Sequence, residues 1–277
     1  MAQFTAPLFT RVRRASALAC AAISLALLTP PSFAEDSQLD ATRAAPKGIK
    51  NIVLVHGAFA DGSSWSKVIM ILQASGYHVT AVQNPLTSLA DDVATTRRAL
   101  ALQDGPAILV GHSWAGVVIT EAGADPKVAG LVYVAAFAPD LGETVSELGK
   151  AYPAPPALEA PITDEKGFLT LPVRAVVEHF AADLPRYEAR TLAATQGPIS
   201  GSAFDAKVSA VAWRTTPSWY IVSRLDEAIA PDEERFFAKR MNATTTELNT
   251  SHVPMLSQPK AVAAVIIAAA TKAPAPR

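Results

Sequence analysis

Cysteine is nearly absent from this sequence, whose 277 residues contain only one, Cys20. A single cysteine excludes an internal disulfide and a cysteine-based metal site, so the fold must depend on its apolar core. The chain has no internal repeat and no glycine-rich phosphate-binding loop. Neither of its apolar stretches, Ala15–Leu28 and Ala261–Ala270, reaches the ~20 residues that a membrane-spanning helix needs.

The first 34 residues have the order of a secretory signal peptide. Three arginines at positions 11, 13 and 14 precede the apolar stretch, and Ser32-Phe33-Ala34 supplies small residues before a cleavage site. Cleavage after Ala34 predicts a periplasmic or secreted protein of 243 residues without cysteine. The removed segment holds three basic and no acidic side chains, so the net charge changes from −1 to −4, which gives no support to nucleic-acid binding. An uncleaved N-terminal anchor is the alternative.

The remaining chain alternates short β-rich runs with longer helical patterns, after a linker over residues 35–49. Near-continuous apolar runs such as Ile52-Val53-Leu54-Val55 suit strands that are buried on both faces, as in parallel sheets covered by helices. This order predicts an α/β fold with a mostly parallel open sheet, in one catalytic domain over residues 50–272 with a tail at 273–277. The predicted strands are Asn51–Val55, Tyr77–Gln83, Ala107–Val110, Val128–Phe137, Ser218–Val222 and Thr244–Asn249. The predicted helices are Ser63–Ser75, Leu89–Gln103, Trp114–Ala122, Asp232–Met241 and Pro259–Thr271.

One stretch interrupts the alternation. From about residue 139 to 214 the chain is rich in proline and alanine, with helical pieces at Val173–Ala181 and Leu184–Ala194 and no recognisable strand. Its place between two core strands predicts a helical cap over the carboxyl edge of the sheet, where open α/β sheets bind ligands. A helical elaboration that does not contact substrate is the alternative.

Ser113 is the most informative residue because it lies in Gly111-His112-Ser113-Trp114-Ala115-Gly116, directly after the apolar run Pro106–Val110. This order predicts a strand, a sharp turn and a helix, with small residues at 111 and 115 that allow a strained turn. Ala115 stands where the usual G-x-S-x-G motif has its second glycine. Glycine-flanked serines are also common in loops, so the nucleophile assignment depends on a base, an acid and an oxyanion hole elsewhere.

His252 is the predicted base for this serine, since a histidine can accept and return a proton near neutral pH. It follows the last predicted strand in a polar loop that can bring it over the same sheet edge as Ser113. The other four histidines receive different assignments: His56 braces the first loop, His78 is structural within a strand, His112 points away from the serine hydroxyl, and His179 belongs to the cap.

A carboxylate on the second imidazole nitrogen fixes the tautomer and stabilises the imidazolium. Asp226 is the predicted acid because it lies in the turn after the strand Ser218–Val222. Its neighbour Glu227 is expected to face solvent, and Asp232 to cap the next helix. Asp140 is the alternative, because it too follows a strand at the carboxyl edge.

The negative charge of a tetrahedral intermediate needs backbone donors, which are expected from two places. The amide of Trp114 directly follows the nucleophile, and the loop His56–Gly62 can supply a second donor, most simply the amide of Ala58. An ordinary glycine-containing turn is the alternative for that loop.

With Ser113, Asp226 and His252 in this order, residues 50–272 resemble the α/β-hydrolase superfamily. Val53–Ala58 with Ser64-Trp65 is similar to the oxyanion loop and first helix of the branch that contains plant methyl-ester esterases, hydroxynitrile lyases and bacterial serine esterases. The elbow around Ser113, the turn at Asp226 and Ser251-His252 match the same branch. The resemblance implies a sheet of the eight-stranded type, a cap inserted after the sixth family strand, no cofactor or metal, and hydrolysis of esters or related substrates.

Two positions favour the esterases within this branch. The lyases have threonine and lysine where this chain has Gly57 and Val253, and relatives that act on epoxides or haloalkanes have aspartate in place of Ser113. The sequence therefore predicts an exported serine hydrolase that cleaves small or moderately apolar carboxylic esters through an acyl-enzyme. The alternatives are cofactor-free perhydrolysis or C–C hydrolysis on the same triad, and a ligand-binding homologue with slow turnover. The oligomeric state stays open.

Overall fold

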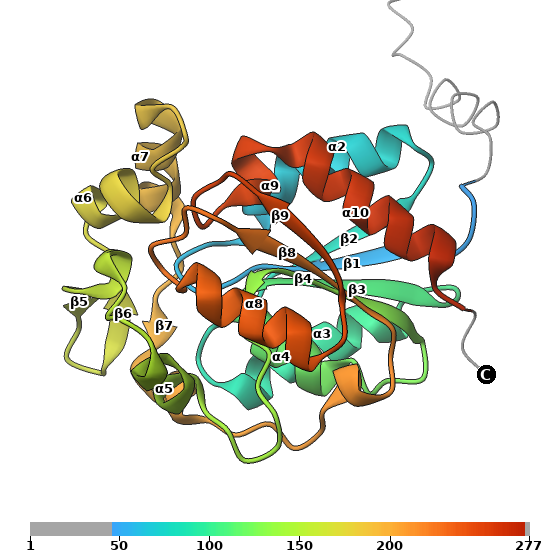
Figure 1. Cartoon of the computed structure of the whole chain (residues 1–277), viewed down its shortest axis with the longest axis horizontal. Helices are drawn as coiled ribbons and strands as arrows, with labels where there is room; N and C mark the ends of the chain where they lie inside the picture. Colours follow the sequence, from blue (N-terminus) through green and yellow to red (C-terminus); the bar gives the residue numbers. More distant parts are fainter. Residues whose placement is uncertain (1–45, 275–277) are drawn as a thin grey trace, which may run out of the picture. The chain divides into compact units, whose positions relative to one another are not determined.

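The computed structural model describes residues 46–274, and six parallel strands form the central sheet of this part (Figure 1). Their spatial order is β2-β1-β3-β4-β8-β9. Each strand overlaps one of the predicted strands, so the α/β fold with a parallel sheet is confirmed. The strands are β1 (Asn51–Val55), β2 (His78–Val82), β3 (Ala107–Ser113), β4 (Val128–Ala136), β8 (Ser218–Ser223) and β9 (Thr244–Leu248).

The eight-stranded type of sheet that the family resemblance implied is wrong for the described residues. Between residue 46 and the first helical turn, the chain has one apolar run, Ile49–Val55, and β1 uses it. The strands β2 and β9 therefore form the two edges of the sheet, and both carry exposed residues such as His78 and Thr244. Edge strands lack a neighbour on one side, which explains why these two are less apolar than the central strands.

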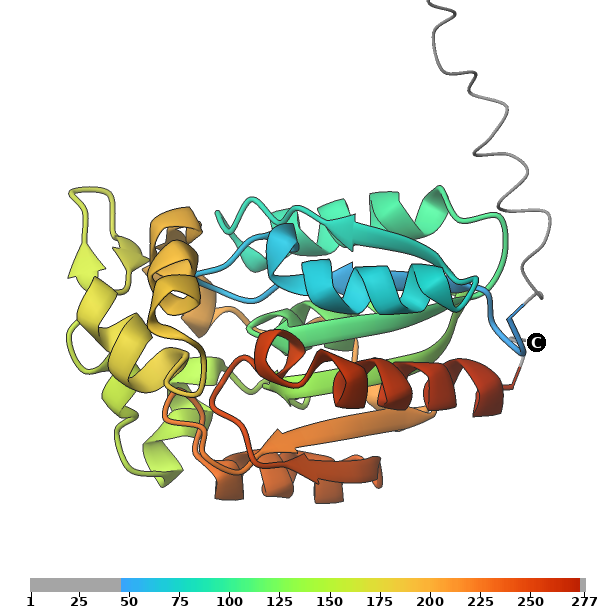
Figure 2. The same ribbon diagram turned by 90° about the horizontal axis from the view of Figure 1, so that it is seen from above.

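Helices cover both faces of this sheet (Figures 1 and 2). On one face lie α2 (Ser66–Ala74) and α10 (Pro259–Lys272), and on the other lie α3 (Leu89–Ala101), α4 (Ala115–Ala122) and α8 (Pro231–Arg240). Because both faces are covered, every residue of β1, β3, β4 and β8 is buried. Two shorter elements, the 3₁₀ turn η1 (Gly62–Trp65) and α9 (Pro254–Ser257), lie next to α2.

The insertion between β4 and β8 contains strands that sequence analysis did not find. A small antiparallel sheet, in the order β5-β6-β7, accompanies the helices of this cap at one end of the central sheet (Figure 2). These strands have only two or three residues each, which is too short for a recognisable alternation of apolar and polar side chains. The cap is thus mixed rather than purely helical. Its elements are α5 (Val145–Leu148), η2 (Gly149–Ala151), η3 (Pro156–Leu158), β5 (Ile162–Thr163), β6 (Phe168–Thr170), α6 (Val173–Ala175), the π-helical turn η4 (Val176–Phe180), α7 (Arg186–Thr195), β7 (Ile199–Ser200), η5 (Gly201–Asp205) and η6 (Ala212–Arg214).

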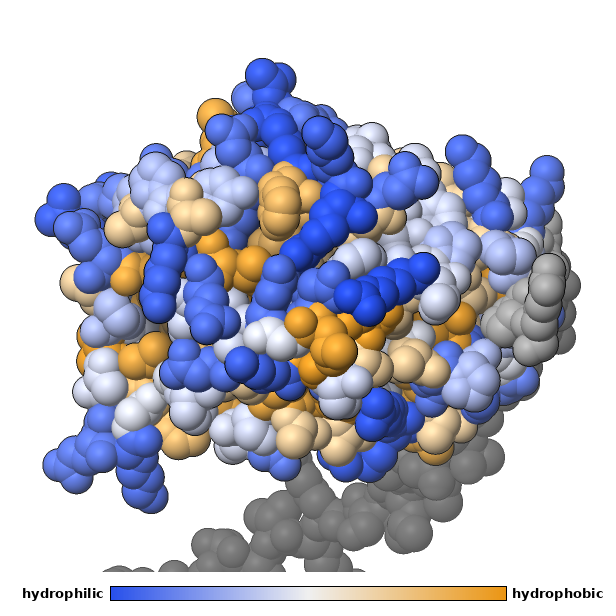
Figure 3. All heavy atoms as spheres, turned by 60° about the horizontal axis from the view of Figure 1, so that its bottom comes forward, coloured by the Kyte–Doolittle hydropathy of each residue, from blue (hydrophilic) through white to orange (hydrophobic). Residues whose placement is uncertain are grey.

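Hydrophilic side chains predominate on the face of the molecule that Figure 3 shows. In Figure 3 hydrophilic side chains surround a smaller group of apolar ones on the side that lies at the bottom of Figure 1. Large exposed hydrophobic side chains come from well-separated positions such as Met70, Leu141 and Phe236, and single exposed apolar residues are ordinary. Within residues 46–274, no helix is long and apolar enough to cross a membrane.

The predicted signal peptide (1–34) and most of the predicted linker (35–49) lie outside the described residues. The same is true of most of the predicted tail, since the description ends at residue 274.

Candidate active site

Ser113 is the last residue of β3 and stands at a sharp turn into α4. Its φ of 54° lies in the left-handed region that side chains other than glycine rarely adopt, so the turn is strained as the sequence predicts. A Cβ on Gly111 would lie 2.7 Å from the carbonyl oxygen of Ala115, which shows that strand and helix approach too closely for a side chain there. Ser113 remains 7% exposed, whereas His112 and Trp114 on either side are completely buried.

Asp226 and His252 are brought together from neighbouring strand ends. Asp226 follows β8 and His252 follows β9, and the Asp226 Oδ2 lies 2.6 Å from the His252 Nδ1 in an almost completely buried pair. Because a carboxylate only accepts hydrogen bonds, Nδ1 carries the proton and Nε2 is left as an acceptor. Among the described residues Nε2 has no hydrogen-bond partner, so it is free to take a proton.

Two backbone amides of the loop that follows β8 hold the second oxygen of Asp226. Its Oδ1 accepts hydrogen bonds from the amides of Ala228, at 2.7 Å, and Ile229, at 2.9 Å. These bonds leave Oδ2 directed at His252. Backbone donors of this kind stabilise the ionised carboxylate, which is the form that an imidazolium needs beside it.

His112 connects the serine turn with the histidine loop. Its Nε2 donates a hydrogen bond to the carbonyl oxygen of His252 at 2.7 Å, and the two imidazole rings lie 4.7 Å apart between centroids. Burial, together with the neighbouring His252, holds the pKa of His112 well below its usual value of 6.5. His112 is therefore neutral, with its one proton used to hold His252 in place.

The two predicted oxyanion donors flank the serine turn. A Cβ on Gly57 would lie 2.8 Å from the Cβ of Ser113, so the loop that carries Ala58 runs directly against the Ser113 turn. In the part of the chain that the structure describes, neither the Ala58 amide nor the Trp114 amide donates a hydrogen bond to another protein group. Both amides are thus available to an external acceptor.

The cap reaches this site with apolar side chains, which sequence analysis did not identify. Phe180 packs on the His252 ring at 4.6 Å between centroids and contacts Phe59, in the loop that carries Ala58, at 6.4 Å between centroids. Phe204 packs on Trp114 at 5.6 Å. A hydrogen bond from the Ser251 hydroxyl to Asp183 also joins the histidine loop to the cap. The cap is therefore part of the wall around the candidate site, rather than an elaboration remote from it.

A buried carboxyl supports the Trp114 side chain. The indole Nε1 donates to the Asp92 Oδ2 at 2.8 Å, and the Asp92 Oδ1 accepts from the Leu86 amide at 2.8 Å. Burial raises the pKa of Asp92 to about 6. Asp92 lies on α3, and its helical position gave no signal of this contact, because only the packing of α3 against α4 brings it to Trp114.

The structure does not bring the alternative acid, Asp140, into the site. Asp140 is paired with Arg214 and accepts a hydrogen bond from the Leu141 amide, without contact to His252. The remaining predicted residues lie as follows: His56 bridges Gly57 and Asn84 in the first loop, His78 contacts Asn51, and His179 pairs with the half-exposed Glu227.

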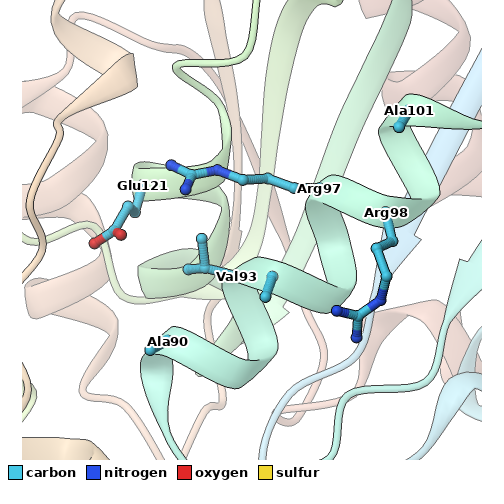
Figure 4. Close-up of a pocket in the computed structure, with 7 residues that line it drawn as sticks. Ala90, Val93, Arg97, Arg98, Ala101 and Glu121 are labelled. Atoms are coloured by element: carbon cyan, nitrogen blue, oxygen red, sulfur yellow. The ribbon is translucent and has the colours of Figure 1, made fainter.

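The described residues form no metal site, and one of their pockets lies away from the candidate residues. No group of three or more histidine, cysteine, aspartate or glutamate side chains within residues 46–274 has the arrangement of a metal site. A pocket of about 450 Å³ lies on the outer side of α3, where the Arg97 side chain extends toward Glu121 (Figure 4). It contains none of the candidate residues.

Comparisons with known proteins agree with this fold and identify proteins that are similar to this chain. The profile of the "Alpha/beta hydrolase family" matches residues 52–265. The alpha/beta hydrolase nvfD of Aspergillus novofumigatus is 26% identical over 248 residues, covering 80% of this chain and 97% of that protein. Methylesterase 7 of Arabidopsis thaliana is 38% identical over 110 residues, which are 33% of this chain and 42% of that protein. A solved pyrethroid hydrolase from Sphingobium faniae JZ-2 has a TM-score of 0.69 at 24% identity, covering 81% of this chain and 98% of that one.

Proposed function

Because the chain belongs to the alpha/beta hydrolase family, we propose that it is a serine hydrolase that cleaves carboxylic esters. One observation carries the proposal: the buried Asp226–His252 pair leaves the His252 Nε2 without a hydrogen-bond partner among residues 46–274, and the same histidine is held by His112, which directly precedes the strained Ser113. The similarity to Methylesterase 7 supports an ester as the substrate.

In the proposed reaction the Ser113 oxygen attacks the ester carbonyl carbon while its proton passes to the His252 Nε2. Asp226 stabilises the resulting imidazolium, and the amides of Ala58 and Trp114 donate to the oxyanion. The tetrahedral intermediate then expels the alcohol, which takes the proton from His252. Water attacks the acyl-enzyme by the same route and releases the acid.

The surroundings of the site support a small or moderately apolar substrate. Phe59, Phe180 and Trp114 are buried at this end of the sheet, and the cap contributes two of the aromatic side chains described above. Apolar walls with a few converging polar groups are the usual composition of a small-molecule site.

The test uses residues 35–277 and p-nitrophenyl esters of short and medium chain length. We expect Ser113→Ala to lower kcat by at least about 10³-fold, because the nucleophile is removed. The matched control is Ser75→Ala, which changes an exposed serine at the end of α2 and should stay within twofold of wild type. Equal activity of wild type and Ser113→Ala would refute the assignment. A single burst of product without further turnover would instead support the ligand-binding alternative.

We further propose that residues 1–34 direct export, on the basis of their basic, apolar and small-residue segments. The full chain is expressed in a Gram-negative bacterium, and the intact mass of the purified protein is measured. A periplasmic protein that begins at Glu35 is expected, and a chain that keeps its first 34 residues would contradict cleavage.

A further inference from the structure

A pocket of about 370 Å³, which we call the cap pocket, lies between cap residues 145–158 and residues 228–233 at the start of α8. Most of its lining is apolar or aromatic and includes Phe137, Tyr152 and Leu158. Among the described residues, Glu233 of α8 supplies the only carboxyl of this lining. No member of the candidate triad lines the cap pocket.

Two contacts fix the walls of the cap pocket relative to each other. The Ala157 amide of the cap donates to the Glu227 carbonyl, in the loop after β8, at 3.0 Å. Arg240 of α8 forms an ion pair with Glu143, at the start of the cap, at 2.8 Å. The pocket is therefore formed before any ligand enters, which reduces the cost of binding.

The carboxyl of Glu233 is buried without a partner. Only 3% of this residue is exposed, and its Oε1 accepts no hydrogen bond from residues 46–274. Lys150 also lines the pocket, but it is an exposed residue and forms no ion pair with Glu233. Arg235 of the same helix is paired with Asp232 and Glu247, at 2.8 Å each. Buried charged groups are normally paired, so Glu233 lacks a partner at the one place where a small molecule can supply it.

The charges around Glu233 favour a cation as this partner. Burial, and then the charge of Asp226, raise the pKa of Glu233 to about 7. The next residue, Glu234, is a second fully buried carboxyl. Tyr152 adds no positive charge, and burial, followed by the charges of Glu233 and Asp232, raises the pKa of its hydroxyl. A positive charge at this position would be attracted by its carboxyl neighbours.

We propose that the cap pocket binds an organic ammonium ion, a small apolar body with a primary amine, whose ammonium group forms an ion pair with the Glu233 carboxylate. The apolar lining takes up the body of the ligand, and the rings of Phe137 and Tyr152 are of the kind that also attract a cation. The proposal goes beyond ester hydrolysis, and binding in the pocket does not depend on Ser113.

The cap pocket adjoins the candidate triad through two of its lining residues. The amide of Ala228 donates to the Asp226 Oδ1 at 2.7 Å, and the amide of Phe137 donates to the Ser113 carbonyl at 3.2 Å. The ammonium group can therefore belong to an ester whose reacting part lies at Ser113, or to a separate amine. Both sources share the chemistry that Glu233 recognises.

The first experiment measures the Kd of phenethylammonium for the purified protein by isothermal titration calorimetry at pH 8. Two further probes separate the parts of the ligand, since 2-phenylethanol has a similar shape without charge and methylammonium has the charge without the apolar body. We expect phenethylammonium to bind at least about tenfold more tightly than either, close to the value of one hydrogen bond to a charged group. Equal affinity for phenethylammonium and 2-phenylethanol, or no binding of phenethylammonium, would overturn the proposal.

The variant for this experiment is Glu233→Gln, which keeps the shape of the side chain and removes its charge. We expect its Kd for phenethylammonium to increase at least about tenfold and its Kd for 2-phenylethanol to stay within about twofold. The matched control is Asp232→Asn, whose side chain is 83% exposed on the same helix and whose Kd should stay within about twofold. Unchanged binding of phenethylammonium by a folded Glu233→Gln protein would overturn the proposal. If that variant does not fold, the comparison of the probes on wild type still decides.

The dependence on pH gives a second readout. With a pKa of about 7, Glu233 is ionised to about one tenth at pH 6 and to about nine tenths at pH 8. An aliphatic ammonium keeps its proton over this range, as a lysine does, so the Kd of wild type should be about tenfold higher at pH 6 than at pH 8. Glu233→Gln should lose this dependence, which separates Glu233 from other groups such as Glu234. Tighter binding at pH 6 than at pH 8 would show that the neutral acid binds the ligand and would overturn the proposal.

Steady-state kinetics with p-nitrophenyl acetate distinguishes the two sources of the ammonium group. Phenethylammonium should raise KM and leave kcat unchanged if its place belongs to part of an ester substrate. It should leave KM unchanged if the cap pocket takes a separate amine. If Ser113→Ala retained full activity, the proposed function would fail, while the binding titrations would still decide whether Glu233 holds a cation.

Discussion

Replacing Asp226 with asparagine is the sharpest test of the candidate triad, because the local contacts fix how the new side chain must lie. The amides of Ala228 and Ile229 donate to Oδ1 at 2.7 and 2.9 Å, so the asparagine oxygen has to remain at that position. Its NH₂ group then takes the place of Oδ2, 2.6 Å from the His252 Nδ1. Two donors cannot face each other, so the imidazole proton must move from Nδ1 to Nε2.

This tautomer removes the base, because the protonated Nε2 can no longer accept the serine proton. It also removes the negative charge that stabilises the imidazolium. From the size of both effects in other serine hydrolases, we expect kcat/KM to decrease by about 10³–10⁴-fold, which corresponds to about 4–5.5 kcal/mol of transition-state stabilisation. The shape of the side chain is preserved, so the folded structure should be retained in far-UV and near-UV circular dichroism.

The assay is hydrolysis of p-nitrophenyl acetate at pH 7.5, with Asp140→Asn as the control. Asp140 also follows a parallel strand, but it is paired with Arg214 and should leave kcat/KM within about threefold. A loss of less than tenfold for Asp226→Asn in a folded protein would refute the reasoning, and so would an equal or greater loss for Asp140→Asn.

Two further predictions concern the loop that carries Ala58, the proposed oxyanion donor, and Trp114, which follows the proposed nucleophile. Gly57→Ala should lower kcat by about 10²-fold, because the new Cβ would lie 2.8 Å from both the Ser113 Cβ and the His112 carbonyl oxygen and would displace the Ala58 amide. The control is Gly105→Ala, whose Cβ would meet only the Asn51 side chain, at 3.7 Å. Trp114→Phe removes the indole N–H that donates to Asp92, a carboxyl whose pKa burial raises to about 6. We expect the free energy of unfolding to decrease by ~1–3 kcal/mol at pH 8, where Asp92 is ionised, and by less at pH 5, where the carboxyl is mostly protonated. Thermal unfolding measures this difference. An equal cost at both pH values would contradict a role for the Asp92 charge.

The central sheet could be predicted from the sequence because parallel strands that helices cover on both faces are buried throughout, and such strands are visible as continuous apolar runs. It also predicted that Asp226 and His252 meet, since each follows a strand and β8 and β9 are neighbours whose carboxyl ends share one edge. The strands of the cap could not be predicted, because pieces as short as Ile162–Thr163 show no periodicity. The partners of the site, such as Phe180 for His252, come from elements far apart in the chain that only tertiary packing brings together.

The sequence also failed to predict which carboxyl groups are buried, for a related physical reason. Asp92 and Glu234 lie in the first turns of α3 and α8, where acidic residues favour the helix dipole and are normally solvated. Nothing in the local sequence distinguishes them from exposed neighbours such as Asp91 and Asp232. Their burial depends on which face of the helix packs against the strand or helix beside it, and that is decided by contacts across the fold.

The two adjacent histidines of this site cannot both carry a positive charge. In the proposed reaction His252 becomes an imidazolium, and the ring of His112 lies 4.7 Å away between centroids. A second positive charge at that distance in a buried position would oppose the proton transfer. Burial lowers the pKa of His112 far enough to prevent this, and its single proton is committed to the His252 carbonyl. In the proposed reaction the positive charge is therefore confined to His252, the one imidazole of the two that is hydrogen-bonded to a carboxylate. This is why His112, directly before the proposed nucleophile Ser113, can support the candidate triad without competing for its proton.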